Sequence, residues 1–498
     1  MIRKRLRALG FWVSVGVALC AFEAAAKDDL VIDMVSEPSS LDPQIQWNPD
    51  SYYVYRNIFD NLVTRDDSGA IVPEIATSWK NISDSVVELE IRGDVKFHDG
   101  KPLTPEDVAF SVNRIIDPKL GSPQQGQFNK IRKAEASGAN KVTLTLDGAY
   151  PALFAQLVKL SIVPKHVVEA VGNDKFNLAP VGSGPYKFVE WKRGVSVALA
   201  RNDDYWGRKG QFKTALFRAV PDAATRLADV QTGSADIVRG LDSDLAGQLK
   251  SSPRAKSVFA LTERLSYIRI NPTKPPFDNL KLRQAVAHAI DKEGLTEGIL
   301  GGFDKPLPQM VTPAHFGWTK DLAGPPYDPA KAKALIVEAG RPPKFDLLIG
   351  TFFDQRIAQA VQQQLRTVGF DVAISLVDTA TFLKAIQQGA SGGPTLAIST
   401  SSCACQDADG ALYQIFHSGN SWSIVENKQI DALLDDGRAT LDEKKRLDDY
   451  AKIAHIIVDE VPTVPLYQMT AIYGASKALQ WTPTPNESFF INRMGWKD

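Results

Sequence analysis

A short extended segment followed by closely spaced prolines constrains the fold of this chain more than any other feature. From Ser266 to Asn271 the residues alternate at the two-residue period of a strand. Pro272, Pro275 and Pro276 then disfavour both a ladder partner and a helix. Asp278 is expected to cap the helix that follows. We therefore interpret the segment as a hinge strand between two lobes that close on a small molecule.

The length and charge of the chain limit its architecture and its partners. At 498 residues it exceeds the size at which a single hydrophobic core stops growing, so two or three domains are expected. Its 57 basic and 58 acidic residues nearly balance, which argues against a basic surface for nucleic acid. We therefore expect a globular monomer with a small-molecule ligand and no nucleic-acid partner.

The N-terminus is typical of a secretory signal peptide. Basic residues between Arg3 and Arg7 precede the apolar run Phe11–Ala21, which is too short to span a bilayer. The small residues Ala24–Ala26 predict cleavage before Lys27. A lipid anchor at Cys20 is the less favoured alternative because a large residue precedes it. No later stretch is apolar enough to span a membrane, so we expect an exported protein of the bacterial periplasm.

Two cysteines remain after the predicted cleavage, and they are separated by a single residue. A disulfide between Cys403 and Cys405 would be strained at this spacing, so we expect the fold to depend on its cores rather than on cross-links. Together with His417 they are the one cluster of soft ligands. No second pair completes a tetrahedral metal site, which favours two small side chains that line a loop.

Five motifs resemble one known family. They are Glu74–Trp79, Phe97–Val108, Pro180–Phe188, Arg201–Trp206 and Pro275–Asp278 with the residues up to Asp291. In this order they resemble the solute-binding proteins of peptide and nickel ABC importers, solute-binding family 5. The match covers almost the whole mature chain. It implies an α/β, two-lobed periplasmic-binding-protein fold of type II with an extra subdomain, in which Pro465–Tyr473 forms a second crossing strand.

This resemblance and the hinge segment give a division into domains. The expected parts are a signal peptide at 1–26, a discontinuous first lobe at 27–47, 168–267 and 473–498, an extra subdomain at 48–167, and a second lobe at 268–472. Within the second lobe, strands and helices alternate from Phe345 to Ser399. Such crossovers build parallel strands, and ligands bind beyond their ends, here in the loops 350–356 and 400–410.

The loop at 400–410 departs from the family pattern. In peptide-binding relatives an aspartate of this loop meets the amino terminus of the peptide, and alignment puts Ala404 at that position and Ser401 where a tryptophan is usual. Burying an ammonium without a counter-charge costs several kcal/mol. A peptide would therefore need Asp407, Glu37 or Asp354 as the replacement.

The candidate ligand-binding residues come from these loops, from the polar turn after the first strand, and from the hinge. They are Glu37, Ser39, Tyr267, Phe352, Asp354, Arg356, Ser401, Cys403, Asp407 and Trp422. Arg356 suits a carboxylate or phosphate, or else lies in solvent at a helix start. Tyr267 and Trp422 suit stacking on a ligand, with packing in the core as the alternative.

Catalysis is not expected. Gly389–Gly393 matches the letters of a serine-hydrolase elbow, but a helix precedes it and a strand follows, the reverse of that motif. We expect no catalytic residue, no cofactor and no resident metal. The predicted function is to capture an oligopeptide, dipeptide or peptide-like compound between two lobes and deliver it to an inner-membrane ABC permease. The alternatives are an opine-like conjugate or a nickel or other metal chelate as the solute, and more distantly a secreted hydrolase.

Overall fold

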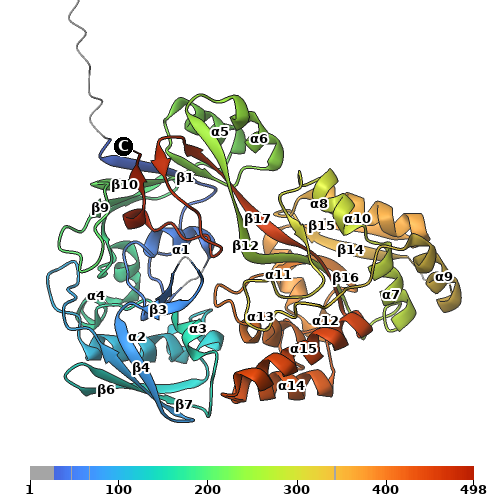
Figure 1. Ribbon diagram of the computed structural model, residues 1–498, viewed down its shortest axis with the longest axis horizontal. Helices are drawn as coiled ribbons and strands as arrows, with labels where there is room; N and C mark the ends of the chain where they lie inside the picture. Colours follow the sequence, from blue (N-terminus) through green and yellow to red (C-terminus); the bar gives the residue numbers. More distant parts are fainter. Residues whose placement is uncertain (1–26, 46–47, 67, 341–343, 498) are drawn as a thin grey trace, which may run out of the picture.

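The computed structural model describes residues 27–45, 48–66, 68–340 and 344–497. The predicted signal peptide, 1–26, lies outside the described residues. Figure 1 shows two lobes joined by two long strands, β12 (Ala255–Ile270) and β17 (Thr463–Ser476), which confirms the predicted two-lobed fold. Within the described ranges, no helix has the length and apolar character needed to cross a membrane.

One mixed sheet of 11 strands runs through both lobes. Its strands lie in the order β15-β14-β16-β12-β17-β11-β1-β10-β9-β8, with β13 paired to β17. Besides β12 and β17, its members are β1 (Asp29–Met34), β8 (Tyr186–Lys192), β9 (Ser196–Arg201), β10 (Thr214–Ala219), β11 (Ile237–Arg239), β13 (Lys305–Pro306), β14 (Phe345–Gly350), β15 (Val372–Val377) and β16 (Leu396–Ser401).

The two long strands are shared between the lobes through their opposite ends. Residues 265–270 of β12 pair with β16 in the second lobe, whereas residues 473–475 of β17 pair with β11 in the first. Between these ends β12 and β17 pair with each other in antiparallel fashion. The prediction of two crossing strands is therefore confirmed, and bending of this pair is the motion that such a fold allows.

A bulge interrupts the hinge pair midway. The partner of Leu261 is Thr470, but the partner of Leu265 is Gln468, so the register shifts over the residues between them. The hydroxyl of Thr262 donates to the carbonyl of Met469 at 2.8 Å, and the amide of Gln468 donates to the carbonyl of Thr262 at 2.7 Å. Bulges redirect side chains out of a ladder, and here they redirect the two charged residues that follow Thr262.

A separate antiparallel sheet forms beside the first lobe. Its order is β4-β5-β7-β6, and α2 packs against β6. One hydrophobic core spans its residues from Leu62 to Ile162. Thr104 caps α2 and forms a capping box with Asp107, as the Thr-x-x-Asp pattern of the sequence predicts. The elements of this part of the chain are β2 (Val63–Arg65), β3 (Ile71–Pro73), β4 (Ala76–Ser83), β5 (Val86–Ile91), α2 (Pro105–Ile116), β6 (Ile131–Gly138), β7 (Lys141–Leu146) and α3 (Leu153–Leu157). Among the described strands, β2 and β3 pair only with each other.

The first lobe has a core in which its own strands meet the end of the chain. That core includes Tyr53, Phe217, Tyr473 and Phe489. Its remaining elements are α1 (Pro49–Tyr55), α4 (Lys165–Leu178), α5 (Ala223–Thr232), α6 (Ser243–Gln248), β18 (Leu479–Gln480) and β19 (Gly495–Trp496). The residue boundaries given above for the lobes and the subdomain stay predictions.

The second lobe buries both faces of its sheet. Ile268 and Ile270 face one core and Leu265 and Tyr267 face the other, so every residue from 265 to 270 is buried. Its helices are α7 (Leu280–Ala289), α8 (Lys292–Gly298), α9 (Pro329–Ala339), α10 (Gln355–Val368), α11 (Thr379–Ile386), α12 (Gly389–Gly392), α13 (Ala408–Phe416), α14 (Lys428–Ala439) and α15 (Glu443–Glu460).

Two predicted helix caps were wrong by one residue. Asn279, not Asp278, caps α7 by accepting from the backbone of Lys281. The sequence pattern predicts Thr379 as the cap of α11, but Asp378, the residue before it, caps this helix in the same way. In both cases the side chain nearest the first free backbone N–H groups takes the capping position.

Candidate functional site

Three cavities lie where parts of the two lobes face each other. The large cavity, of 520 Å³, is bounded by Gln480–Arg493, by the turn after β2, and by Ala314 and Gln406 of the second lobe. The second cavity, of 470 Å³, shares Arg65, Ala314 and Gln406 with it. The small cavity, of 150 Å³, has walls at 126–159 and 402–438. The two larger ones have the size of typical ligand pockets, about 300–1,000 Å³.

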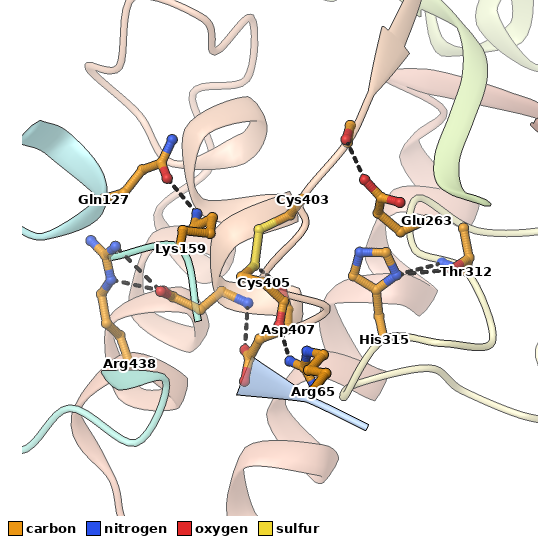
Figure 2. Close-up of a disulfide and its surroundings, with 12 residues drawn as sticks. Arg65, Gln127, Lys159, Glu263, Thr312, His315, Cys403, Cys405, Asp407 and Arg438 are labelled. Carbon is orange, nitrogen blue, oxygen red and sulfur yellow. Dashed lines mark hydrogen bonds and ion pairs between the residues drawn. A yellow bond between two sulfur atoms is a disulfide. The ribbon is translucent and has the colours of Figure 1, made fainter. Parts of the chain in front are cut away.

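The loop from Ser402 to Asp407 lies at the meeting point of these cavities. It follows β16 and precedes α13, and contrary to expectation Cys403 and Cys405 form a disulfide (Figure 2). The two Cα atoms are 5.0 Å apart, within the range that a disulfide spans, so the thiols can meet. Gly410 lies directly beneath, where an added Cβ would come within 2.5 Å of both sulfurs.

Contacts from three directions hold this loop. Arg65, from β2, donates to the carbonyl of Cys405. Tyr150 donates from the neighbouring subdomain to Asp409, in the first turn of α13 just after the loop, at 3.1 Å. Ser402 donates to the Oε1 atom of Glu263 in the hinge at 2.9 Å. The loop therefore contacts the subdomain and the hinge at once.

Buried ion pairs fix the end of the loop to the helices behind it. Asp407 caps α13 and accepts from the Nη2 atom of Arg446 at 2.8 Å. Asp409 accepts from the Nε atom of Arg438 at 2.7 Å. Burial raises the pKa of Asp407, and the Arg446 charge opposes that rise. Since Asp407 is already paired, it is poorly placed to serve as counter-charge for a ligand ammonium.

Glu263 is a buried carboxylate that sequence reasoning missed. It lies in the β12 bulge, is 2% exposed, and its Oε2 atom has no hydrogen-bond partner among the described residues. Glu263 does not itself line the three cavities, but its backbone N–H donates to Pro485 of the large cavity and its side chain accepts from Ser402 of the small one. Burial raises the pKa of Glu263 because the ionised carboxyl has lost its water.

The next residue in the bulge is neutralised locally. Arg264 pairs with Glu487 at 2.7 Å, and Arg239 reaches the same carboxylate at 3.2 Å. The hydroxyl of Tyr53 donates to that carboxylate at 2.8 Å. These contacts tie the hinge to the C-terminal segment of the first lobe and leave Glu263 as the bulge charge without an ion pair among the described residues.

Comparison with known proteins identifies the family. The model for the bacterial extracellular solute-binding proteins, family 5 middle region, matches residues 70–423. The chain belongs to this family. The probable D,D-dipeptide-binding periplasmic protein DdpA of Escherichia coli K12 is 28% identical, and the match covers 95% of each chain.

Two solved structures are similar over almost their whole length. The ABC transporter substrate-binding protein CtaP of Listeria monocytogenes has a TM-score of 0.87 and 26% identity, covering 95% of this chain and 100% of its own. MoaA of A. tumefaciens R10 in complex with mannopinic acid has a TM-score of 0.81 and 25% identity, with the same coverage. Family 5 members of this kind are substrate-binding proteins of ABC importers rather than enzymes.

Two of the residues predicted for ligand binding in this family 5 protein line the cavities. Cys403 lines the small cavity and Asp407 lines the second. Ser401 ends β16 beside them, paired with Leu265. Tyr267 is buried in the core of the second lobe. Trp422 is partly buried and lines none of the three cavities.

The other predicted residues lie in two groups away from the cavities. In the first lobe, Glu37 accepts from Trp191 and Gly194, and Ser39 contacts Ser51. After β14, Phe352 packs on Phe353 and Phe382, Asp354 caps α10, and Arg356 pairs with Asp354 at 2.7 Å and with Asp244 at 3.5 Å. Neither group contributes to the walls of the three cavities.

The proposed soft-ligand cluster does not assemble. Cys403 and Cys405 are joined to each other, and His417 stacks on Tyr413 and contacts Asp435. The described ranges contain no group of three or more His, Cys, Asp or Glu side chains that would hold a metal ion. Ser391 of the elbow-like motif lies in the short helix α12, with α11 before it and β16 after it.

Proposed function

We propose that this protein captures a zwitterionic, peptide-like solute between its lobes in the periplasm and hands it unchanged to an inner-membrane ABC permease. The observation that carries the proposal is Glu263. A buried carboxylate with one unpartnered oxygen, at the hinge between two lobes, requires a cation for full compensation. The ammonium group of a solute is that cation.

This role for Glu263 accounts for the change in the loop at 400–410. The family resemblance puts Ala404 at the position of the ammonium-binding aspartate. Ala404 lines the small cavity two residues after Ser402, whose hydroxyl donates to Glu263. The carboxylate that the loop lacks is therefore supplied from the hinge strand that runs alongside it, and the solute still finds a counter-charge in the same region.

The large cavity supports an acidic solute. Its walls carry Arg65, Arg208 and Arg493, with Asp66 as the one acidic side chain among the lining residues that the structure describes. Arginine favours carboxylates because its planar donors match their geometry. DdpA is described as a D,D-dipeptide-binding protein and MoaA holds mannopinic acid, so both a peptide and an opine-like conjugate fit this chemistry.

The solute is identified by native mass spectrometry of the protein purified from the periplasm, followed by a thermal-shift screen of peptides, opine-like acids and metal chelates. We expect a bound amine that also carries a carboxylate. Glu263→Gln should lower its affinity by at least tenfold, because a charged hydrogen bond contributes about 1.5–3 kcal/mol. Glu37→Gln is the matched control and should bind normally.

Two results would contradict the proposal. Binding that is indifferent to Glu263→Gln would remove the assigned counter-charge, and recovery of a chemically altered solute would show turnover. For the second result, mass spectra of the solute before and after incubation are compared for the wild type and Ser391→Ala. A metal-chelate ligand would instead give nickel-dependent melting that survives Glu263→Gln.

A further inference from the structure

Lys159 is a buried cation without an acidic partner. It follows α3, is 6% exposed, and lines the small cavity. Within the described ranges its Nζ atom donates to the amide oxygen of Gln127 and forms no ion pair. Burying an ammonium group against a neutral amide leaves most of its hydration uncompensated. An anion that entered the cavity would supply the missing charge.

The walls of the small cavity do not provide that anion themselves. The one acidic side chain among its lining residues is Asp409, and both of its oxygens are taken by Arg438 and Tyr150. With Lys159 and Arg438 both cationic, the lining carries an excess of positive charge. Glu263 acts on Lys159 from the hinge, on the other side of the disulfide in the view of Figure 2.

A second group in the same wall lacks a partner. Gln156 is 2% exposed, and its amide oxygen has no hydrogen-bond partner among the described residues. An amide oxygen accepts from N–H or O–H donors. The cavity thus lacks a negative charge at Lys159 and a donor at Gln156, three residues away along the chain.

We propose that the small cavity is a subsite for the acid end of the solute, whose carboxylate pairs with Lys159 while the adjacent N–H donates to Gln156. This inference rests on the proposed function, since it assigns the carboxylate of the solute whose ammonium Glu263 holds. The chemical class is an N-substituted amino acid. Both the C-terminal residue of a peptide and an opine-like acid present a carboxylate beside such a nitrogen.

The volume of the small cavity fits this group and little more. A cavity of about 150 Å³ holds a molecule the size of benzene, which has about six heavy atoms. A carboxylate with its Cα and nitrogen has about five heavy atoms, which suits the 150 Å³ of the small cavity. Cys403 and Ala404 also line the small cavity, so the disulfide-closed loop lies beside the acid end.

The surroundings of Lys159 also give the subsite a pH dependence. Burial lowers the pKa of Lys159 from 10.5 to about 7, against the opposing charges of Asp409 and Glu263. Arg438 and the phenol of Tyr413 face the same cavity from α14 and α13. A bound carboxylate favours the protonated amine, so binding takes up a proton at neutral pH and weakens as the pH rises above 7.

The test compares each acid with its amide. The probes are alanyl-alanine with its C-terminal carboxamide, in L,L and D,D forms, and N-ethylglutamate with its α-carboxamide. We expect the wild type to bind at least one acid tenfold to a hundredfold more tightly than its amide, the range that a charged hydrogen bond of about 1.5–3 kcal/mol gives. Whichever pair shows this ratio separates a peptide from an opine-like solute.

Two variants of the lysine give the decisive readout. Lys159→Met and Lys159→Gln should bring the ratio of acid to amide close to one while the affinity for the amide stays unchanged. Titration calorimetry in two buffers of different ionisation enthalpy should show proton uptake with the wild type and none with the variants. Lys165→Met, at an exposed lysine of α4, is the matched control and should behave as the wild type.

The outcomes separate this inference from the proposed function. If the wild type binds acid and amide equally well, or if the variants retain the ratio, the subsite assignment is overturned while capture of an amine at Glu263 stands. If none of the probes binds, and the solute recovered from the periplasm lacks either an amine or a carboxylate, both proposals fall together.

Discussion

Two loops of the second lobe occupy equivalent places in the sheet, yet they have different surroundings. One follows β14 at residues 351–354, and the other follows β16 at residues 402–407. Both strands run parallel and end at the same edge of the sheet. Ligands bind beyond such strand ends, which is why both loops were predicted to contribute to the site. The walls of the three cavities include the second loop and not the first.

The difference comes from what each loop faces. After β14, Asp354 and Arg356 neutralise each other, and Arg356 reaches Asp244 of α6. After β16, the loop meets the subdomain through Arg65 and the hinge bulge through Glu263. A ligand site is thus possible at the end of a parallel strand. Whether a cavity forms there depends on which part of the first lobe or subdomain faces the loop.

Breaking one ion pair in each loop should give the largest difference in unfolding free energy between the two loops. The Asp407–Arg446 pair has side chains that are 6% exposed on both partners, whereas Asp354 and Arg356 are 33% and 47% exposed. Asp407→Asn leaves a buried guanidinium unpaired and should cost about 3–5 kcal/mol of unfolding free energy. Asp354→Asn, the matched control, should cost less than about 1 kcal/mol. Urea denaturation measures both, and equal losses would contradict the contrast.

Removing the disulfide should have the next largest effect. For a closed loop of about three residues, the chain-entropy relation gives about 1.5 kcal/mol. The double variant Cys403→Ser/Cys405→Ser avoids a lone thiol and should lose about this much stability by thermal unfolding. Since the loop lines the small cavity, affinity for the solute should fall as well. Unchanged affinity would show that the loop keeps its shape without the cross-link.

Glu263→Gln should stabilise the empty protein, by on the order of 1 kcal/mol at pH 7, because it removes a buried charge without an ion pair. The raised pKa of Glu263 also determines the direction in which stability changes with pH. Above the ordinary value of 4.5 the folded state binds more protons than the unfolded state, so stability falls as pH rises toward the raised pKa.

Thermal unfolding of the ligand-free protein at a series of pH values checks this expectation. In Glu263→Gln the part of the loss of stability with rising pH that comes from Glu263 should disappear. Glu37→Gln should still show that loss. A variant that melts lower than the wild type at pH 7 would mean that the carboxylate is compensated within the protein itself.

The smallest effect is expected in the loop after β14. Phe352 is 51% exposed and packs on Phe353 and Phe382 at the surface. Phe352→Ser should change the unfolding free energy by less than about 1 kcal/mol and leave solute affinity as it is. A loss of affinity in isothermal titration would return this loop to the binding site.

Much of the fold could be predicted from local patterns. A Thr-x-x-Asp pattern at Thr104 predicts a capping box, Asp328 before Pro329 predicts a helix cap, and Gly369 predicts a helix end. All three are confirmed, because each depends on a few neighbouring residues. The caps of α7 and α11 were misplaced by one residue since two capping residues stand side by side in each case. The two crossing strands came from the hinge pattern together with the family resemblance.

The site was harder to predict because it depends on contacts between distant segments. The alternation predicted a strand only from Ser266, three residues after Glu263, and alternation alone does not reveal a bulge whose partner lies more than 200 residues away. The available signal was the pair of adjacent charged residues Glu263 and Arg264 just before the alternating segment. Lys159 gave no signal at all, since its burial follows from the subdomain docking on the loop after β16.

The register shift in β12 places a carboxylate midway along the pair of strands that join the lobes. When two rigid bodies rotate about a common axis, groups near the axis travel least. A solute anchored by its amine at Glu263 would thus keep its position while the distant walls swing over it. When the lobes open, the end of the solute farthest from its amine would then be released first, and the amine would leave Glu263 last.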